Sequence, residues 1–235
     1  MDSKGYRTPL HLTASSTKNT VDMCKILVSS GANINNGHGK NNKSVLHAAV
    51  KENNYEMVKY LLENNVRTDI TENYCETVLH TAAENNSLEI LKLLLEKEPS
   101  YLDFPRSQRG NETALHIAAE AGYEDICKEL LSTGAYIMIV NSKGMTALHL
   151  AARNLHSSVI RILLGQKSTD ISELVNMVDN QGRTALFVCT TSKGRGATEC
   201  MDILLRFGAD PDIQNQDGFS ALHVAAIGRW LFSVT

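Results

Sequence analysis

The stretch TALHIAAEAGYEDICKELLSTGA, residues 113–135, contains the pattern that decides the fold. After Thr113, the residues Leu115, Ala118 and Ala119 lie at the spacing that places side chains on one face of a helix. The segment EAGY then supplies a glycine suited to ending a helix, and a second apolar pattern follows it. The stretch therefore predicts two short helices joined by a tight turn.

The pattern of residues 113–119, TALHIAA, occurs in seven variants along the chain. Each copy starts with Ser or Thr, whose hydroxyl can accept a hydrogen bond from the first N–H groups of a helix. A unit of turn, helix, turn and helix cannot bury its own apolar face, so such units must stack into a solenoid with a continuous core. The copies start at Thr8, Ser44, Thr77, Thr113, Thr146, Thr184 and Ser220, with spacings of 36, 33, 36, 33, 38 and 36 residues.

The shared pattern T-x-L-H-x-A-A, at a period near 33 residues, resembles the signature of the ankyrin repeat family. The resemblance covers essentially the whole chain and implies an all-α solenoid of helix-turn-helix units with connecting β-hairpin loops. We expect a single ankyrin-repeat domain over residues 1–235. Its repeats are predicted at residues 1–37, 38–71, 72–107, 108–140, 141–178, 179–214 and 215–235.

The last predicted repeat is truncated. With the spacing of residues 113–145, the second helix of this repeat would extend past Thr235. The segment GRWLFSVT, residues 228–235, is therefore expected to form only the first turn of a second helix. A first helix without its partner exposes apolar side chains, so we also expect weak self-association through this end of the chain.

The composition is that of a folded, soluble chain, with 43% apolar and 21% charged residues. The 23 Lys and Arg residues against 26 Asp and Glu residues give a net charge of −3 without a basic stripe, which argues against nucleic-acid binding. Neither a signal peptide nor an apolar run of about 18 residues is present, so membrane insertion is not expected. Five cysteines without a C-x-x-C pair favour reduced thiols, and hence an intracellular, cytoplasmic location.

The histidines and cysteines follow the repeat and do not converge on a reactive site. Four cysteines fall in apolar helix columns, whereas Cys75 lies in a hairpin and leaves an enzyme with a reactive thiol as the remaining alternative. We expect no enzymatic activity, no catalytic residue, no cofactor and no metal. The resemblance implies that the motif histidine of each repeat forms a hydrogen bond with the neighbouring loop. These histidines are His11, His47, His80, His116, His149 and His223.

The resemblance further implies a protein–protein interaction module, such as an adaptor or a scaffold, that binds its partner on a concave face and on the hairpin tips. In ankyrin-like stacks two columns of residues face the concave surface. The first column precedes the motif Ser or Thr, and the second follows the paired alanines. An alternative is that the chain is the cytoplasmic repeat array of a larger protein, such as an ankyrin-type transient receptor potential channel.

The two columns predict the partner-binding residues. Four glutamates fall on the third and fourth repeats, with basic residues in the repeats on both sides. Like charges held close together repel, so we expect a protein partner that supplies a basic segment. The acidic residues are Glu76, Glu84, Glu112 and Glu120, and the basic ones are Arg7, Lys43, Arg153 and Arg183.

Overall fold

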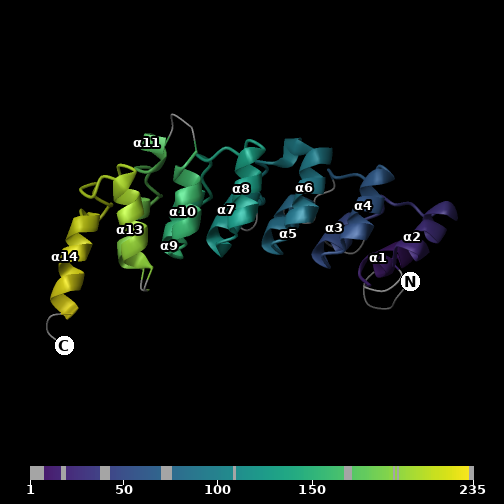
Figure 1. Ribbon diagram of the computed structural model, residues 1–235, viewed down its shortest axis with the longest axis horizontal. Helices are drawn as coiled ribbons and strands as arrows, with labels where there is room; N and C mark the ends of the chain where they lie inside the picture. Colours follow the sequence, from purple (N-terminus) through teal and green to yellow (C-terminus); the bar gives the residue numbers. More distant parts are fainter. Residues whose placement is uncertain are drawn as a thin grey trace. The chain divides into compact units, whose positions relative to one another are not determined.

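The computed structural model describes residues 8–16, 20–37, 43–69, 76–107, 110–166, 171–192, 194 and 196–232, the last five of these as helix backbone only. The chain divides into two compact units, residues 1–114 and 115–235, and each is considered by itself. Within the described ranges there are fourteen α-helices, one 3-10 helix and isolated β-bridges between loop residues (Figure 1). This architecture confirms the predicted all-α solenoid. The single domain and its repeat boundaries stay predictions.

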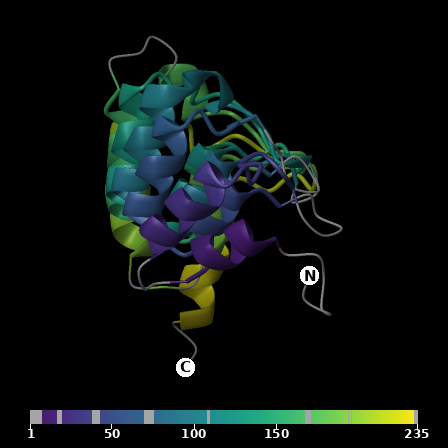
Figure 2. The ribbon, with the colours of Figure 1, turned by 90° about the vertical axis from the view of Figure 1, so that its right-hand side faces the viewer.

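The first unit is built from stacked helix pairs. The first helices of successive pairs pack on one another, and the second helices do the same, so the apolar face of each pair is covered by its neighbours. The loops that join the pairs project to one side of the helices (Figure 2). The pairs are α1 (Pro9–Ala14) with α2 (Thr20–Ser29), α3 (Val45–Lys51) with α4 (Tyr55–Glu63), and α5 (Val78–Glu84) with α6 (Leu88–Lys97), followed by η1 (Pro99–Tyr101).

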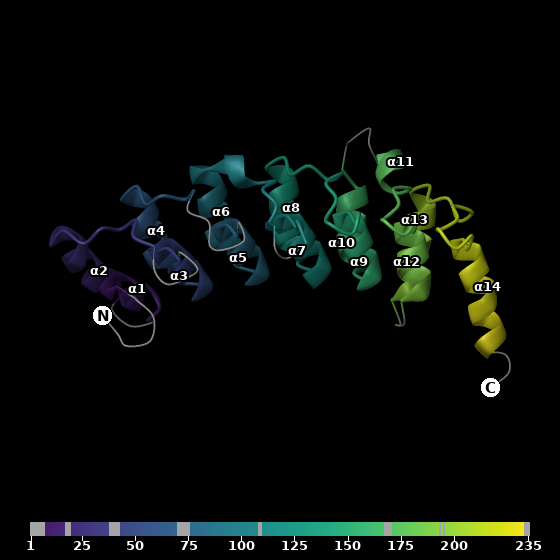
Figure 3. The ribbon, with the colours of Figure 1, turned by 180° about the vertical axis from the view of Figure 1, so that it is seen from behind.

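The second unit repeats the arrangement. Its helix α10 packs against α8, α9 and α13, and α12 packs against α9, α13 and α14 (Figure 3). The helices are α7 (Ala114–Ala121), α8 (Glu124–Ser132), α9 (Ala147–Arg153), α10 (Ser157–Leu164), α11 (Ile171–Leu174), α12 (Ala185–Thr191), α13 (Ala197–Arg206) and α14 (Ala221–Phe232).

The ends of the first helices follow from local chemistry. Ser44 Oγ accepts a hydrogen bond from the His47 N–H at 3.2 Å, and Thr184 Oγ1 accepts one from the Phe187 N–H at the same distance. At the other end, a residue with positive φ reverses the chain toward the second helix. This residue is Asn53 (+53°), Asn86 (+55°), Gly122 (+78°) or Leu155 (+60°) in successive repeats.

The last repeat departs from the prediction for residues 228–235. The expected start of a second helix does not form within the described residues, because α14 continues as one helix to Phe232. Arg229 occupies the position at which the other repeats leave the helical conformation. No second helix among the described residues packs on α14 to draw the chain back, and tertiary packing is what stabilises such short helices.

The small residues of the repeats form the core, as predicted. The paired alanines Ala118, Ala119, Ala151 and Ala152 are fully buried, as are Cys24, Cys127, Cys189 and Cys200. Burial raises the pKa of the Cys127 and Cys189 thiols to about 12, and it also raises the pKa of Cys24 and Cys200. These thiols are therefore protonated and unreactive at neutral pH. Cys75 lies outside the described residues.

Candidate functional site

The motif histidines connect each repeat to the loop of the next one, as the resemblance implies. In every case the acceptor is the backbone carbonyl of the residue in the first concave column. Within the described part of the chain, the Nε2 atoms of His11, His47, His80, His116 and His149 lie 3.0, 3.3, 3.1, 3.1 and 3.1 Å from the carbonyl oxygens of Lys43, Glu76, Glu112, Met145 and Arg183.

The hydrogen bonds also define the protonation of these imidazoles. The backbone N–H of Thr77 donates to His80 Nδ1 at 3.1 Å, and that of Thr146 donates to His149 Nδ1 at 3.2 Å. Nδ1 is therefore an acceptor, and the proton on Nε2 is donated to the carbonyl. Burial lowers the pKa of His80 to about 4, helped by the positive charge of Arg106, and burial also lowers the pKa of His149. Both rings are neutral at pH 7 and serve to hold the loops.

Three of the predicted glutamates converge on one arginine in the first unit. Arg106 Nη1 pairs with Glu84 Oε1, and Arg106 Nη2 lies 2.7 Å from Glu112 Oε2. Glu76 Oε1 is farther away, at 3.9 Å from Nη1. The arginine is buried, with 7% of its surface exposed, whereas the three carboxylates remain partly accessible. We call Glu76, Glu84, Glu112 and Arg106 the acidic cluster.

The acidic cluster places three carboxylates around one buried cation. Three carboxylates surround one guanidinium, and the pKa of Arg106 is raised because its hydrogen bonds to Glu112 and Glu84 outweigh the opposing effect of burial. The guanidinium is thus always charged. Its charge offsets part of the negative charge of the three carboxylates.

Sequence reasoning missed Arg106, although the repeat contains a signal for it. The Arg106 N–H donates to the Glu112 carbonyl at 2.9 Å, just as the N–H of Asn141 donates to Met145 and that of Asp179 donates to Arg183. Arg106 therefore opens the hairpin of the fourth repeat, in the column of Asn141 and Asp179. Because this hairpin is two residues longer than the other two, a count from the motif threonine does not reveal the match.

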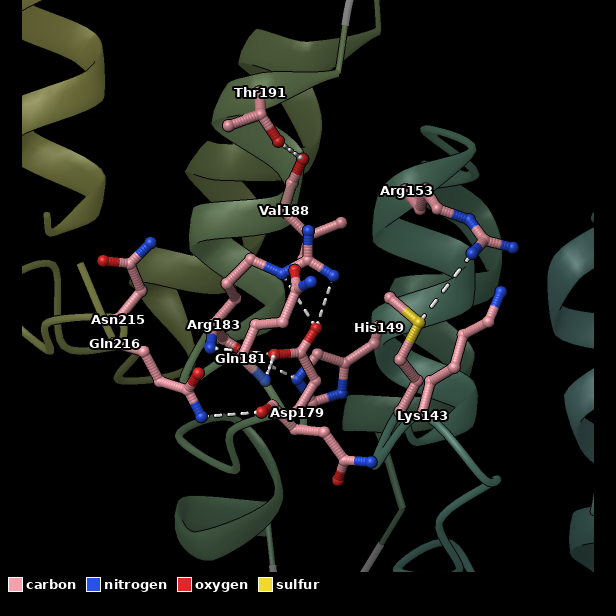
Figure 4. A network of polar contacts seen from close by, with 12 residues as sticks. Lys143, His149, Arg153, Asp179, Gln181, Arg183, Val188, Thr191, Asn215 and Gln216 are labelled. Carbon is pink, nitrogen blue, oxygen red and sulfur yellow. Dashed lines mark hydrogen bonds and ion pairs between the residues drawn. The ribbon is translucent and has the colours of Figure 1, made fainter. Parts of the chain in front are cut away.

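Glu120 belongs to the second unit and has a different partner. Its Oε1 lies 2.5 Å from Arg153 Nη2, and Arg153 Nη1 also approaches the Met145 sulfur at 3.8 Å. Figure 4 shows Arg153 extended toward this sulfur. Glu120 and Arg153 thus neutralise each other, and Glu120 is not part of the acidic cluster.

Arg183 is also paired within the second unit. Its Nε and Nη2 atoms donate to Asp179 Oδ2 at 2.8 and 2.6 Å, and the two side chains face each other below α12 (Figure 4). Burial alone would raise the pKa of Asp179, but hydrogen bonds from the Arg183 side chain and from backbone N–H groups lower it below its ordinary value. Of the other predicted basic residues, Lys43 is half-buried and supplies the acceptor for His11, and Arg7 lies outside the described residues.

The hairpin tips of the second unit form a continuous hydrogen-bonded series. Asn180 donates from its backbone N–H to the Lys143 carbonyl at 2.9 Å, and Gln216 donates likewise to the Gln181 carbonyl at 3.0 Å. The Gln216 side chain adds a bond to the Asn180 carbonyl at 2.8 Å. The tips are therefore held in fixed positions relative to their neighbours, as a recognition surface requires.

Two further kinds of structural feature are absent from the described residues. No group of three or more His, Cys, Asp and Glu side chains there could hold a metal ion. None of the helices in that part of the chain has the length and apolar character needed to cross a membrane.

Comparison with known proteins agrees with this architecture. Over 115 residues the chain is 35% identical to the human transient receptor potential cation channel subfamily A member 1. The aligned region covers 48% of this chain and 10% of the channel. The chain spans about a tenth of the length of the curated relatives that it matches.

Solved structures match most of the chain. The ankyrin repeat domain of Bcl-3, a member of the IκB protein family, has a TM-score of 0.77 with 26% identity, covering 93% of each chain. A chain of the complex between a predatory endopeptidase from Bdellovibrio bacteriovorus and its immunity protein has a TM-score of 0.67 with 29% identity, covering 78% of this chain and 91% of that one. The family pattern described as ankyrin repeats in three copies matches residues 1–74, 64–141 and 134–213. The chain therefore belongs to the ankyrin repeat family.

Proposed function

We propose that this chain is an adaptor or scaffold module, and not an enzyme, that binds a cytoplasmic protein partner through its concave columns and hairpin tips. Ankyrin repeats generally mediate protein–protein interaction, and the rigid, tip-bonded loops of the second unit support such a role. The finer proposal is that the partner presents a basic segment to the acidic cluster.

The three partly accessible carboxylates of the acidic cluster are the observation that carries this proposal. Arg106 is bound closely by Glu84 and Glu112, and Glu76 Oε1 lies 3.9 Å from Arg106 Nη1. A lysine or arginine from a partner would be attracted to these carboxylates, because they lie close together and are partly exposed. Because such a contact is partly shielded from water, its electrostatic contribution exceeds that of an exposed ion pair.

The test is binding to a partner captured from a cell lysate with the intact chain. Glu76→Gln removes one carboxylate without breaking the close pairs of Arg106, and we expect it to weaken binding severalfold and to reduce the dependence of binding on salt. The matched control is Glu63→Gln, which changes an exposed glutamate at the end of α4. Equal affinity of the parent and both variants would contradict the basic-segment proposal and direct attention to the hairpin tips.

A second candidate is that the chain is part of the cytoplasmic repeat array of a larger protein, such as an ankyrin-type transient receptor potential channel. The similarity to the human subfamily A channel over 115 residues favours it. Sequencing the source transcript on both sides of the region that encodes this chain tests it. Further ankyrin repeats followed by a membrane domain would support this candidate, and untranslated sequence on both sides would contradict it.

We also propose that the isolated chain self-associates weakly through the end of the second unit. Leu222 and Ile227 of α14 are each 52% exposed, and exposed apolar side chains favour association. Sedimentation equilibrium at increasing concentration tests this, and a strictly monomeric chain at high concentration would contradict it.

A further inference from the structure

The sixth repeat has cysteines at two positions that carry hydrocarbon side chains in the second to fifth repeats. One position lies on the first helix of each repeat, five residues after the motif Ser or Thr, and the other lies on the second helix. In the fifth repeat these positions are Ala151 and Val159, and in the sixth they are Cys189 of α12 and Cys200 of α13. All four side chains are fully buried. The second, third and fourth repeats have alanine at the first position and Met57, Ile90 or Ile126 at the second.

The two cysteines compensate for each other in size. Cysteine is larger than alanine and smaller than valine, so Cys189 with Cys200 keeps a total volume close to that of Ala151 with Val159. Core substitutions that conserve volume are tolerated best, whereas a change at only one position would overfill the core or leave a cavity. The core therefore accepts the pair, which brings two thiols into a place where the other repeats have hydrocarbon.

The fold places these thiols against each other. Helices α12 and α13 pack on each other (Figure 3), and Cys189 Sγ lies 3.4 Å from the Ala197 carbonyl oxygen in the first turn of α13. Cys200 follows one turn later, and its thiol forms a hydrogen bond with the thiol of Cys189. Cys127 differs, because burial and the Glu124 carboxylate raise its pKa without a contribution from a second thiol among the described residues.

We propose that Cys189 and Cys200 form a reversible disulfide, which makes the sixth repeat a site of redox modification. The oxidant is a hydroperoxide, with hydrogen peroxide as the simplest case. One thiol loses its proton, and its sulfur attacks a peroxide oxygen, so that the O–O bond breaks and a sulfenic acid and one water molecule form. The second sulfur then attacks the first, the S–O bond breaks, and the hydroxyl leaves as water with the proton of the second thiol. Two thiols and one hydrogen peroxide thus give one disulfide and two water molecules.

Local opening of the sixth repeat gives the oxidant access to the thiols. Cys189 and Cys200 are buried and protonated in the closed repeat, so hydrogen peroxide reaches them only while the repeat is open. Opening should be easiest here, because Phe187 replaces the motif histidine and because the two positions are 11 residues apart, against 8 in the fifth repeat. Closure then returns the second thiol to the sulfenic acid and allows the disulfide to form.

The disulfide would join the two helices of the least stable complete repeat. It closes a loop that contains residues 190–199, and a cross-link of this kind restricts the open chain more than the closed one. The oxidised repeat should therefore open less often than the reduced repeat. Disulfides of cytosolic proteins are usually transient and sense oxidants, which agrees with the reduced, buried state of both cysteines in this structure.

The experiment uses the full chain with Cys75→Ser, so that this hairpin cysteine cannot link two chains. Trypsin cleaves after Lys193 and Arg195, and it therefore separates Cys189 from Cys200 unless a disulfide joins them. After treatment with hydrogen peroxide and alkylation of the remaining thiols, mass spectrometry should show residues 184–193 linked to residues 196–206, and dithiothreitol should separate them. Amide exchange in residues 184–206 should be at least about tenfold slower in the linked chain.

Two variants of the Cys75→Ser chain serve as controls. Cys189→Ala restores the residue of the other repeats, so it should fold normally and give no linked peptide. Cys127→Val removes a buried thiol elsewhere and should leave the link unchanged. The proposal is overturned if hydrogen peroxide leaves Cys189 and Cys200 reduced, if it oxidises them without linking them, if the link joins two chains, or if the linked chain exchanges as fast as the reduced one.

Discussion

Arg106 shows how a single residue controls the charge of a surface. Its guanidinium is buried among three carboxylates, and its Nε atom has no hydrogen-bond partner among the described residues. A buried charge is tolerated only when its partners offset the loss of hydration. The carboxylates depend on Arg106 in the same way, since without it three negative charges would be held close together.

Replacement of Arg106 should therefore be costly. We expect Arg106→Ala to lower the free energy of unfolding by about 3 kcal/mol at pH 7, because it removes the buried cation that binds the carboxylates of Glu84 and Glu112. Urea unfolding followed by circular dichroism measures the change. The control is Arg67→Ala, which breaks an exposed pair with Asp69 and should cost much less, because water screens that pair. Similar losses for the two variants would show that the acidic cluster does not need its arginine.

His80 should make the stability depend on pH. Its pKa is about 4 in the folded protein and near 6.5 in the unfolded chain, so the unfolded chain takes up the proton first as the pH falls. The stabilisation from this residue is complete above pH 6.5 and decreases between about pH 6.5 and pH 4, by roughly 3 kcal/mol.

The variant His80→Gln isolates this effect. Although it loses the imidazole, its urea midpoint should decrease less steeply than that of the parent between pH 7 and pH 4.5. An equally steep decrease in both proteins would assign the pH dependence to other groups. His149, whose pKa is lowered by burial as well, remains in both proteins and contributes equally to each.

At the scale of elements, the hairpin tips of the second unit are packed too closely to accept a side chain at one glycine. Gly144 has φ of +71°, and a Cβ atom added there would lie 2.3 Å from Asn180 Oδ1 and 2.7 Å from the Asn180 backbone nitrogen. Gly218 has a similar φ of +79° but no atom within 4 Å of such a Cβ. The two glycines therefore separate backbone strain from the close approach of neighbouring tips.

We expect Gly218→Ala to cost about 1 kcal/mol, because alanine rarely adopts a positive φ. Gly144→Ala should cost at least 1 kcal/mol more, since it also forces the Asn180 tip away and breaks the tip-to-tip hydrogen bonds. Urea unfolding of the two variants side by side provides the comparison. An equal loss of stability would mean that the tips move apart without penalty.

At the scale of the whole molecule, the sixth repeat should be the weakest part of the array. Phe187 stands where the other repeats have the motif histidine, so it cannot donate to the Phe219 carbonyl as His149 does to Arg183. The last repeat also leaves its apolar face exposed. In a solenoid, stability is approximately a sum of repeat terms and neighbour terms. The missing interactions therefore lower the stability of the sixth and seventh repeats more than that of distant repeats.

Hydrogen exchange should follow this pattern. We expect amide exchange to be fastest in residues 184–235 and slowest in the third to fifth repeats, because local opening requires least energy where interfaces are poorest. Mass spectrometry of peptides from the exchanged, full-length chain measures it. Uniform protection along the chain would contradict the expectation and would imply that the array opens only as a whole.

The helix pairs, the alanine core and the role of the histidines could be predicted from residues 113–135 and their copies. Each of these features depends on contacts that recur at one fixed spacing, such as the bond from His80 to the loop of the next repeat. A repeated interaction leaves a repeated residue, and the sequence alone is then sufficient.

Features that occur once in the chain could not be predicted in this way. The pairing of Arg106 with Glu84 and Glu112 depends on the path of one longer hairpin, and the continuation of α14 to Phe232 depends on the lack of a packed second helix among the described residues. Neither feature recurs in the other repeats, so neither produces a repeated sequence pattern. The pairing within the acidic cluster and the exposure of Leu222 on α14 are set by which side chains meet in space, because electrostatic and packing energies depend on distance and not on sequence separation.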